Sequence, residues 1–192
     1  MNVIENGFQL VLGSKSPRRQ ELLAGMGFQF EIRTKDTDET FPTSLQPVDV
    51  PVFLAELKSD ALVETLVEGE VLITSDTIVL LEGEILGKPT DATHATEMLR
   101  RLAGKSHDVV TGVCLRSAQK KHSFSVSTRV YFKPLSTEQI NYYVANYKPF
   151  DKAGSYGIQE WIGYVGIDKI EGSYFNVVGL PTAELWDALK AF

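Results

Sequence analysis

The chain has 192 residues, of which 43% are hydrophobic and 23% are charged, a balance typical of a soluble globular protein. Its 19 basic and 25 acidic side chains give a formal net charge of −6. Because affinity for nucleic acids and anionic membranes comes from basic surface, this charge argues against both as partners. The single cysteine, Cys114, excludes an intrachain disulfide and is typical of a reducing compartment.

No targeting or membrane segment is evident. The first residues contain no cationic segment followed by an apolar run, so we expect no signal peptide. The longest apolar stretch, residues 71–81, is interrupted by polar residues and is too short to span a bilayer. With no repeat and no linker in the sequence, we expect one cytoplasmic domain over residues 1–192.

Hydrophobic spacing predicts helices mixed with strands along the chain. In the first half we expect a strand at 8–12, a helix at 18–26 after Ser16 and Pro17, a strand at 28–32, an acidic loop at 35–40, a helix at 50–67, and a strand at 71–81 that turns at 82–84 into 85–86. In the second half we expect a helix at 93–103, strands at 108–116 and 123–132, a helix opened by a capping box at 136–139 and reaching 147, a loop at 154–158, and a terminal helix at 181–191. Because some strands are joined as hairpins, this order predicts a mixed α/β fold rather than a purely parallel, doubly wound sheet.

A basic helix start lies at residues 14–19, Ser-Lys-Ser-Pro-Arg-Arg. Arg18 and Arg19 oppose the helix dipole in the first turn, which costs about 0.3–1 kcal/mol each when they are exposed. One interpretation is a solvated helix start. The other is a phosphate site, because Lys15, the hydroxyls of Ser14 and Ser16 and free backbone N–H groups can point to one place, and Arg grips phosphate in a bidentate manner. This convergence favours the phosphate site.

Asp76 is the only charged residue in the strand-like run 71–79. A carboxylate in a buried strand is costly unless it is paired or bound to a metal. Asp76 therefore either lies at a strand end, hydrogen-bonded to local hydroxyls, or serves as a general base or metal ligand. We favour the functional role and expect an unpaired charge at this position.

Other polar residues carry weaker signals. Lys88 is displayed in a Gly-Lys-Pro loop, and Lys58 lies beside the apolar face of the helix 50–67, where helix statistics predict that it is exposed. Glu39, together with its neighbours Asp36 and Asp38, can hold a hard cation through oxygen ligands. A solvated acidic loop is the commoner explanation for such a group.

Two segments near the C-terminus are candidates for ligand contact. Residues 152–159, Lys-Ala-Gly-Ser-Tyr-Gly-Ile-Gln, contain two glycines that permit close backbone approach to a ligand or simply form a turn. Gln159 carries one donor group and one acceptor, so it can pair with the edge of a nucleobase. Residues 172–181 mix polar groups with a strand-to-helix junction, and we expect a second helix N-terminus to face the site.

Several common motifs are missing. Residues 83–89 have the wrong spacing for a Walker P-loop, with Pro89 where Ser or Thr should stand. The sequence contains neither Gly-x-Gly-x-x-Gly nor His-Glu-x-x-His. Three scattered histidines and one cysteine argue against a zinc site, and we expect Cys114 in the core.

These segments together resemble the Maf family of nucleoside triphosphate pyrophosphatases. The matching pieces cover most of the chain in order: 14–23, 38–39, 58, 75–77, 87–89, 107–112, 151–159 and 172–181. The resemblance implies a mixed twisted sheet with flanking helices and two lobes around a cleft, like that of the inosine triphosphate pyrophosphatases. It also implies hydrolysis of a nucleoside triphosphate between the α- and β-phosphates with a divalent cation, Mg²⁺ or Mn²⁺.

The resemblance assigns roles to individual positions. Asp76 matches the proton acceptor, and together with Glu39 it is expected to hold the cation; whether Asp76 mainly binds metal or takes the proton stays open. The residues expected to bind substrate, some of them setting substrate choice, are Ser14, Arg18, Arg19, Glu39, Lys58, Thr77, Lys88 and Gln159.

The segments 155–159 and 172–181 resemble the branch that acts on dTTP and UTP rather than the one that acts on 7-methyl-GTP. One departure is that Glu160 follows Gln159, where that branch usually has Gly. Two other functions remain open: a nucleotide-binding regulator of cell division and septum formation, which Asp76 argues against, and a house-cleaning pyrophosphatase for modified nucleotides. A homodimer also remains open.

Overall fold

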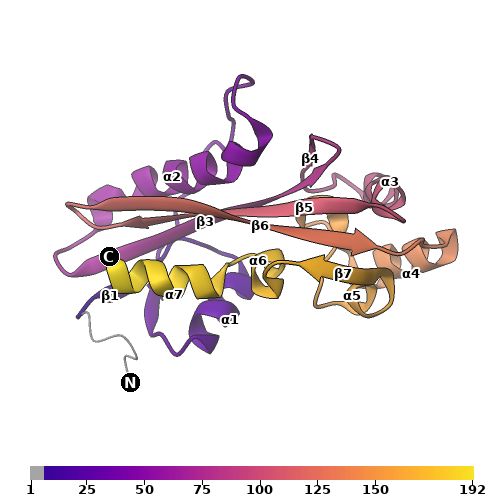
Figure 1. Ribbon diagram of the computed structural model, residues 1–192. Helices are drawn as coiled ribbons and strands as arrows, with labels where there is room; N and C mark the ends of the chain where they lie inside the picture. The colour runs from indigo at the N-terminus through magenta and orange to yellow at the C-terminus, as the bar shows by residue number, and fades with distance from the viewer. Residues whose placement is uncertain (1–6) are drawn as a thin grey trace. The chain divides into compact units, whose positions relative to one another are not determined.

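A computed structural model describes residues 7–192, so the expectation about a signal peptide concerns residues outside the described part. The helices and strands are β1 (Gln9–Leu12), α1 (Pro17–Gly25), β2 (Phe30–Ile32), α2 (Val50–Leu62), β3 (Glu70–Leu81), β4 (Glu84–Leu86), α3 (Ala92–Leu102), β5 (Ser106–Arg116), β6 (Lys121–Phe132), α4 (Thr137–Tyr147), α5 (Trp161–Gly166), β7 (Ile167–Glu171), α6 (Tyr174–Val178) and α7 (Thr182–Ala191) (Figure 1). Single 3₁₀ turns occupy Pro47–Asp49, Val63–Thr65 and Ala153–Ser155. Among the described residues, no helix has the length and apolar character needed to cross a membrane.

Within the described residues, the strands form a seven-stranded sheet in the order β2-β1-β3-β5-β6-β7, and β4 pairs with β3. Strand β1 runs parallel to both β2 and β3. The pairs β3–β4 and β6–β7 are antiparallel. This mixture of parallel and antiparallel pairs, with helices in between, confirms the predicted mixed α/β fold.

The described residues group into two compact units. Unit 1 contains the described residues up to Asp76 together with Thr111–Val126 and Gly179–Phe192, and unit 2 contains Thr77–Val110 and Ser127–Val178. Strands β3, β5 and β6 each contribute residues to both units. The expectation of one domain over residues 1–192 stays a prediction.

The core of unit 1 lies on both faces of β1 and β3. Because side chains alternate along a strand, Leu10 and Leu12 share one face of β1. There they pack in one apolar cluster with residues of α1 and α7, among them Leu23 and Leu185. On the other face, Val11 packs with Leu62 at the end of α2 and with Leu72 of β3. Figure 1 shows the same division, with α1 and α7 on one side of these strands and α2 on the other.

Helix α2 comes unusually close to the sheet at Gly112 of β5. A Cβ atom at Gly112 would lie 2.3 Å from the carbonyl carbon of Pro51 and from the backbone nitrogen of Val52. No side chain fits in that space, so the glycine lets the first turn of α2 contact β5 directly. This approach sets the position of α2.

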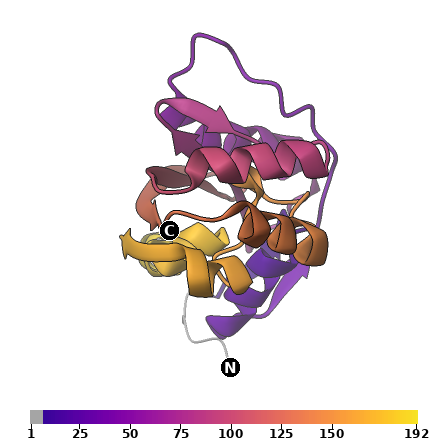
Figure 2. The same cartoon turned by 90° about the vertical axis from the view of Figure 1, so that its right-hand side faces the viewer.

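The core of unit 2 is built around α3 and α4, which pack against each other (Figure 2). One apolar cluster joins Leu99 of α3 and Tyr143 of α4 to Val79, Val130 and other buried residues of the strands. The predicted capping box at the start of α4 is confirmed. Ser136 Oγ accepts a hydrogen bond from the Gln139 N–H, and Gln139 Oε1 accepts one from the Ser136 N–H.

Most predicted elements are present, with differences at their ends. The helix predicted at 50–67 ends at Leu62 and continues only as a 3₁₀ turn, which leaves Val67 exposed. Ser16 precedes α1 as predicted, but its side chain makes no capping hydrogen bond. The elements α5, β7 and α6 were not predicted, because each has only five or six residues. Cys114 lies in β5 with no exposed surface, which confirms its predicted place in the core.

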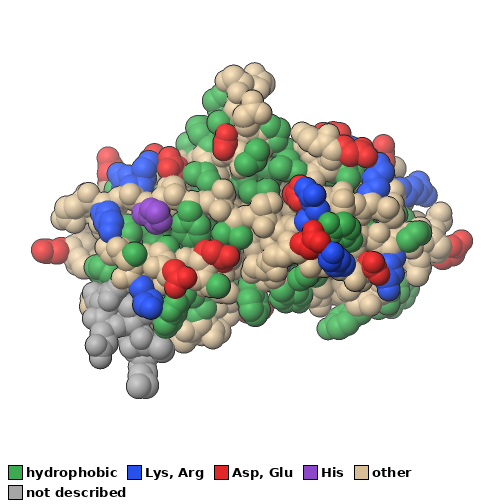
Figure 3. All heavy atoms as spheres, viewed as in Figure 1, with side chains coloured by type: hydrophobic (Ala, Val, Ile, Leu, Met, Phe, Trp, Pro, Cys, Tyr) green, Lys and Arg blue, Asp and Glu red, His purple; other side chains and the backbone are tan. Residues whose placement is uncertain are grey.

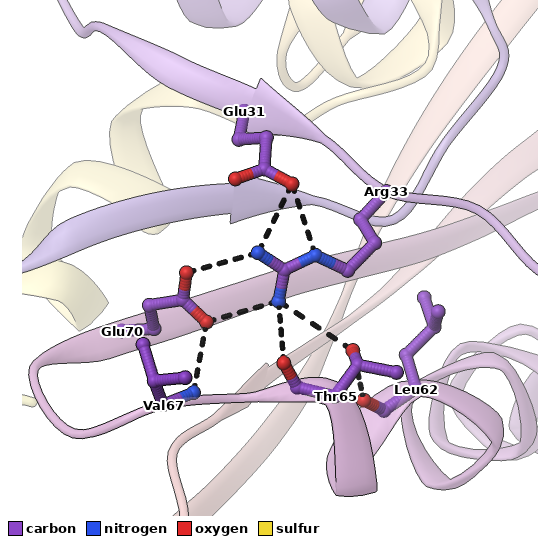
Figure 4. A network of polar contacts seen from close by, with 6 residues as sticks. All are labelled: Glu31, Arg33, Leu62, Thr65, Val67 and Glu70. Atoms are coloured by element: carbon purple, nitrogen blue, oxygen red, sulfur yellow. Dashed lines mark hydrogen bonds and ion pairs between the residues drawn. The ribbon is translucent and has the colours of Figure 1, made fainter.

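A charged network joins the ends of β2 and β3 in unit 1 (Figure 4). Arg33 binds both carboxylate oxygens of Glu70 at 2.9 Å, and it also contacts Glu31 and the Thr65 carbonyl. Glu70 is buried and also accepts a hydrogen bond from the Val67 N–H. The hydrogen bonds from Arg33, foremost, hold the pKa of Glu70 below its ordinary value.

We expect Glu70→Gln to lower the free energy of unfolding by about 1–3 kcal/mol, because it weakens hydrogen bonds made to a charged group in a buried position. The contribution of Glu70 to the free energy of unfolding depends on pH in a predictable direction. Since folding lowers the pKa of Glu70, the contribution is complete above the unfolded pKa of about 4.3 and is lost as the pH falls below it. Urea unfolding between pH 3 and pH 7 measures both effects. The exposed Glu84→Gln, which loses a pair with Arg101, is the control and should change stability little. An equal effect of the two variants would contradict the prediction.

Candidate active site

Asp76, the single charge of its strand, is paired with Lys58 of α2. Lys58 Nζ lies 2.7 Å from Asp76 Oδ1 and 3.2 Å from Glu39 Oε1. Only 17% of the Lys58 side chain and 14% of the Asp76 side chain are exposed. The expectations of an unpaired Asp76 and an exposed Lys58 are therefore wrong, because the ammonium and the carboxylate neutralise each other. One lysine joins two carboxylates that lie far apart in the sequence.

The pairing follows from the register between β3 and α2. Thr74 Oγ1 donates a hydrogen bond of 2.7 Å to the carbonyl oxygen of Ala55. Asp76 follows Thr74 by two residues on the same face of the strand, and Lys58 follows Ala55 by three residues on the same face of the helix. The Lys58–Asp76 pair is therefore the next contact along the same interface, within the short polar stretch 74–77 of β3.

Arg19 lies in the same group of charges. Its Nε donates to the Gly179 carbonyl at 2.9 Å, and its Nη1 donates to the Ser75 carbonyl at 2.8 Å. The pKa of Arg19 is lowered, foremost by burial and also by Arg18, whereas the charges of Asp76 and Glu39 act in the opposite direction. These interactions place Arg19 near Asp76 and Glu39, and Arg18 near Arg19. They also give Arg19 a structural task, because two of its donor groups bind backbone carbonyls.

The remaining polar residues of the loop 14–19 do not all converge. Ser14 is buried, and its Oγ accepts a hydrogen bond from the Ser16 N–H. Lys15 points to the exposed Asp36, with Nζ and Oδ1 2.7 Å apart, so its ammonium is engaged outside the group around Asp76. Arg18 is half-buried. Of the cations in this segment, Arg19 is the one whose interaction with Asp76 is evident.

The acidic loop 35–40 divides its carboxylates among different partners. Asp36 pairs with Lys15, Asp38 accepts from the Thr40 N–H, and Glu39 pairs with Lys58. In the part of the chain that the structure describes, no group of three or more His, Cys, Asp or Glu side chains is placed to hold a metal. The carboxylates that lie beside one ammonium are Asp76 and Glu39.

In unit 2, the loops that carry Lys88 and Gln159 are joined. The N–H of Gly154 donates to the Gly87 carbonyl at 3.1 Å. Gly154 adopts a φ of +67°, and a Cβ there would lie 2.9 Å from Val79 Cγ2, so only glycine lets the loop rest on β3. Thr77 precedes Val79 by two residues on the same strand and is half-buried, whereas Lys88 is exposed.

Gln159 has one unsatisfied polar atom. Its Oε1 is buried and finds no hydrogen-bond partner within residues 7–192. A buried acceptor without a partner is costly, so such atoms in native proteins usually meet a ligand or water. The side chain is thus available to a donor that comes from outside the chain.

The segment 172–181 is partly structural. The Asn176 amide of α6 donates to the Val109 carbonyl and to Thr128 Oγ1, both at 3.0 Å. Helix α6 is therefore attached to β5 and β6. The expectation that a helix N-terminus in this segment faces the site stays a prediction.

Sequence reasoning missed three contacts near the loop of Gln159. Glu160 contacts both Tyr143 of α4 and Lys152, and the Tyr156 hydroxyl lies 2.7 Å from Nε2 of the buried His107. Burial lowers the pKa of His107 to about 4, so this histidine is neutral at neutral pH. In the sequence, Glu160 was noted as a departure from the resemblance, but no pattern there relates it to Tyr143.

The pairing of Asp76 reverses the expected effect of removing its charge. We expect Asp76→Asn to lower the free energy of unfolding by about 1–2 kcal/mol, because Lys58 loses a charged hydrogen-bond partner. Lys58→Met should cost more, because it leaves both Asp76 and Glu39 without their shared ammonium. Urea unfolding of both variants at neutral pH measures the order. A rise in stability for Asp76→Asn would show that the carboxylate is strained despite its partner.

Comparison with known proteins places the chain in a family. Residues 9–192 match the family model Maf, described as Maf-like protein. A protein of Bacteroides fragilis is 50% identical over 184 residues, and one of Bacteroides thetaiotaomicron is 48% identical over 184 residues; each match covers 95% of both chains. One of Porphyromonas gingivalis is 48% identical over 188 residues, which is 96% of this chain and 94% of the relative. All three are named dTTP/UTP pyrophosphatase.

Two solved structures are also similar. The Ham1 protein of Staphylococcus aureus matches 65% of this chain and 71% of its own with a TM-score of 0.46 and 14% identity. A nucleoside-triphosphatase, dITP/XTP pyrophosphatase, of Mycobacterium abscessus matches 96% of this chain and 97% of its own with a TM-score of 0.48 and 12% identity. From the family model and the relatives near 50% identity, we conclude that this chain belongs to the Maf-like protein family.

Proposed function

We propose that this protein hydrolyses dTTP and UTP to the nucleoside monophosphate and pyrophosphate. The observation that carries the proposal is the group formed by Lys58, Asp76 and Glu39, with Arg19 nearby. A carboxylate among cations, in a partly buried position, suits the activation of water next to a phosphate chain. The relatives' name, dTTP/UTP pyrophosphatase, supports the same reaction.

Three cations are candidates for binding the phosphates. Arg18 of α1 offers a planar group that can bind two phosphate oxygens, and the Lys58 ammonium is a compact charge. In unit 2, Lys88 is displayed in an exposed loop. Arg19 is better suited to holding backbone carbonyls in place, and Ser14 to shaping its turn, than to gripping phosphate.

We further propose that Asp76 and Glu39 hold a divalent cation, Mg²⁺ or Mn²⁺. The donor set fits, because Mg²⁺ in nucleotide sites is bound by one or two carboxylates together with substrate phosphates. Both carboxylates lie against one ammonium, that of Lys58, so their oxygens are held around a common point. When bound, the cation would polarise the attacked phosphoryl group and neutralise its charge.

Asp76 is the proposed proton acceptor. Lys58 Nζ lies 2.7 Å from Asp76 Oδ1, which restrains that oxygen of the carboxylate. The other oxygen, Oδ2, is then placed to take a proton from a water molecule that attacks phosphorus. Lys58 thus orients the base, and it also stabilises the negative charge that a base must carry before the reaction.

Gln159 and Thr77 are the proposed residues of substrate choice. The buried, unpartnered Oε1 of Gln159 can accept a hydrogen bond from an N–H at the edge of a nucleobase, and the amide nitrogen can donate one. Both dTTP and UTP present such a donor beside an acceptor. A cytoplasmic location and a homodimer stay predictions.

The proposed reaction predicts a specific product pattern. With Mg²⁺ or Mn²⁺, the purified protein should release pyrophosphate from dTTP and UTP in preference to other nucleotides. A panel of common and modified triphosphates, with pyrophosphate and phosphate measured separately, tests this. Release of phosphate alone would refute the reaction. Faster turnover of modified purine nucleotides would indicate a house-cleaning enzyme. Binding of nucleotide without turnover would indicate a regulator.

Asp76→Asn should reduce kcat by on the order of 10² or more, the scale of a lost general base. Asp60→Asn is a matched control. Asp60 also lies on α2 near Lys58, and the variant loses an ion pair with Arg116, whose Nη1 lies 3.7 Å from Asp60 Oδ1. Its kcat should stay close to that of the wild type. Titration with Mg²⁺ separates the two roles of Asp76: partial rescue points to metal binding, and no rescue to the base. Near-normal turnover of Asp76→Asn at every metal concentration would refute the mechanism.

A further inference from the structure

Gln159 lies in a tight turn that leads into α5. The Glu160 N–H donates to the Gly157 carbonyl at 3.0 Å, and the Gly163 N–H donates to the Glu160 carbonyl at 2.9 Å. A Cβ atom at Gly163 would lie 1.7 Å from the Ile158 carbonyl oxygen, so α5 begins in direct contact with the turn. The backbone of Gln159 is therefore held on both sides.

The Glu160 side chain folds back beneath this turn. A Cβ atom at Gly157 would lie 2.9 Å from Glu160 Cδ, which shows how closely the carboxylate packs against the backbone. Glu160 Oε2 accepts a hydrogen bond from the Tyr143 hydroxyl, and Oε1 lies 3.1 Å from Lys152 Nζ. The side chains of Lys152 and Glu160 are only 10% and 20% exposed.

Tyr143 connects the turn to α4. It is fully buried, its hydroxyl accepts the Gly157 N–H at 3.0 Å, and the same hydroxyl donates to Glu160. Burial, above all, and the carboxylate of Glu160 raise the pKa of Tyr143, so the hydroxyl keeps its proton and remains a donor. A continuous chain of hydrogen bonds thus runs from Gly157 through Tyr143 to Glu160, and Lys152 balances its charge.

The position of Gln159 depends on this support. Its own Oε1 makes no hydrogen bond within the described residues, so no contact of that atom orients the side chain. What sets its direction is the backbone of the turn, which Glu160 braces from below. A change in the turn would therefore shift the Gln159 amide without altering the contacts among Lys58, Asp76 and Glu39.

On the basis of the proposed function, we propose that Glu160 is a positioning residue for base discrimination: its carboxylate, held by Tyr143 and Lys152, fixes the turn that presents Gln159. The group that Gln159 would recognise is the pyrimidine base of the substrate. The effect of Glu160 is therefore measured as the preference of the enzyme among nucleotide bases.

The test compares substrate preference in Glu160→Gly and Glu160→Gln. The measured quantity is the ratio of kcat/KM for dTTP and UTP to that for ATP and GTP, from pyrophosphate release. Glu160→Gly should lower this ratio by about tenfold, the effect of losing one hydrogen bond to a charged group. Glu160→Gln should keep most of it, because the amide oxygen still accepts from the Tyr143 hydroxyl.

Glu171 offers a matched control in the same unit. Its carboxylate also accepts from a tyrosine, Tyr131, at 2.8 Å, and pairs with a lysine, Lys169. This second triad is exposed, over β6 and β7, where Figure 3 shows basic and acidic side chains interleaved on the surface. Glu171→Gln should leave the preference among bases unchanged.

A double-mutant comparison links Glu160 to Gln159. Gln159→Ala should also lower the ratio, and adding Glu160→Gly to it should cause little further loss, because the brace then has no side chain to position. Full additivity of the two losses would overturn the proposal. So would an equal loss on all nucleotides with an unchanged ratio, since that pattern belongs to a merely structural role.

Hydrogen exchange tests the brace without any substrate. In the nucleotide-free protein, Glu160→Gly should speed amide exchange at residues 153–160, whereas Glu171→Gln should not. Tyr143→Phe removes the same hydrogen bond from the other side and should act like Glu160→Gly. If the wild type releases no pyrophosphate from any nucleotide, the proposed function fails. Unchanged exchange in Glu160→Gly and Tyr143→Phe overturns the brace itself.

Discussion

The ion pair between Lys58 and Asp76 is the interaction on which the polar part of unit 1 depends. A strand that is apolar on both faces tolerates a carboxylate only where a cation meets it, and α2 delivers that cation. The close approach of α2 at Gly112 and the hydrogen bond from Thr74 to Ala55 hold the helix at the required position. Packing therefore determines the electrostatics, and the partly buried setting makes each charge count for more than it would in water.

The sequence predicted where chemistry would lie better than how its residues would meet. Asp76 was recognisable because a charge in an apolar strand needs an explanation, and the periodicity of α2 and β3 was enough to predict both elements. The partnership with Lys58 was not predictable, because helical spacing tells which face a lysine occupies but not what that face contacts. That information lies in the register between a helix and a strand, which is a property of the folded chain.

The C-terminal third was harder to predict for a different reason. Helix α5 has six residues, two of them glycines, so neither length nor propensity distinguishes it from a loop. It exists because the chain is held at both ends, by the turn at Gly157 and by the pairing of β7 with β6. Glu160 could be noticed in the sequence, but its contact with Tyr143 could not be predicted. Helical spacing indicates only that Tyr143 lies on the buried face of α4.

Cys114 has a consequence for how the folding of this protein can be followed. Its thiol is the only one in the sequence, and it has no exposed surface near the C-terminal end of β5. An alkylating reagent therefore has a single target, and it reaches that target only when the strand separates from its neighbours. The rate of alkylation therefore reports how often the sheet opens around β5. The measurement needs no introduced label, and no second thiol contributes to the signal.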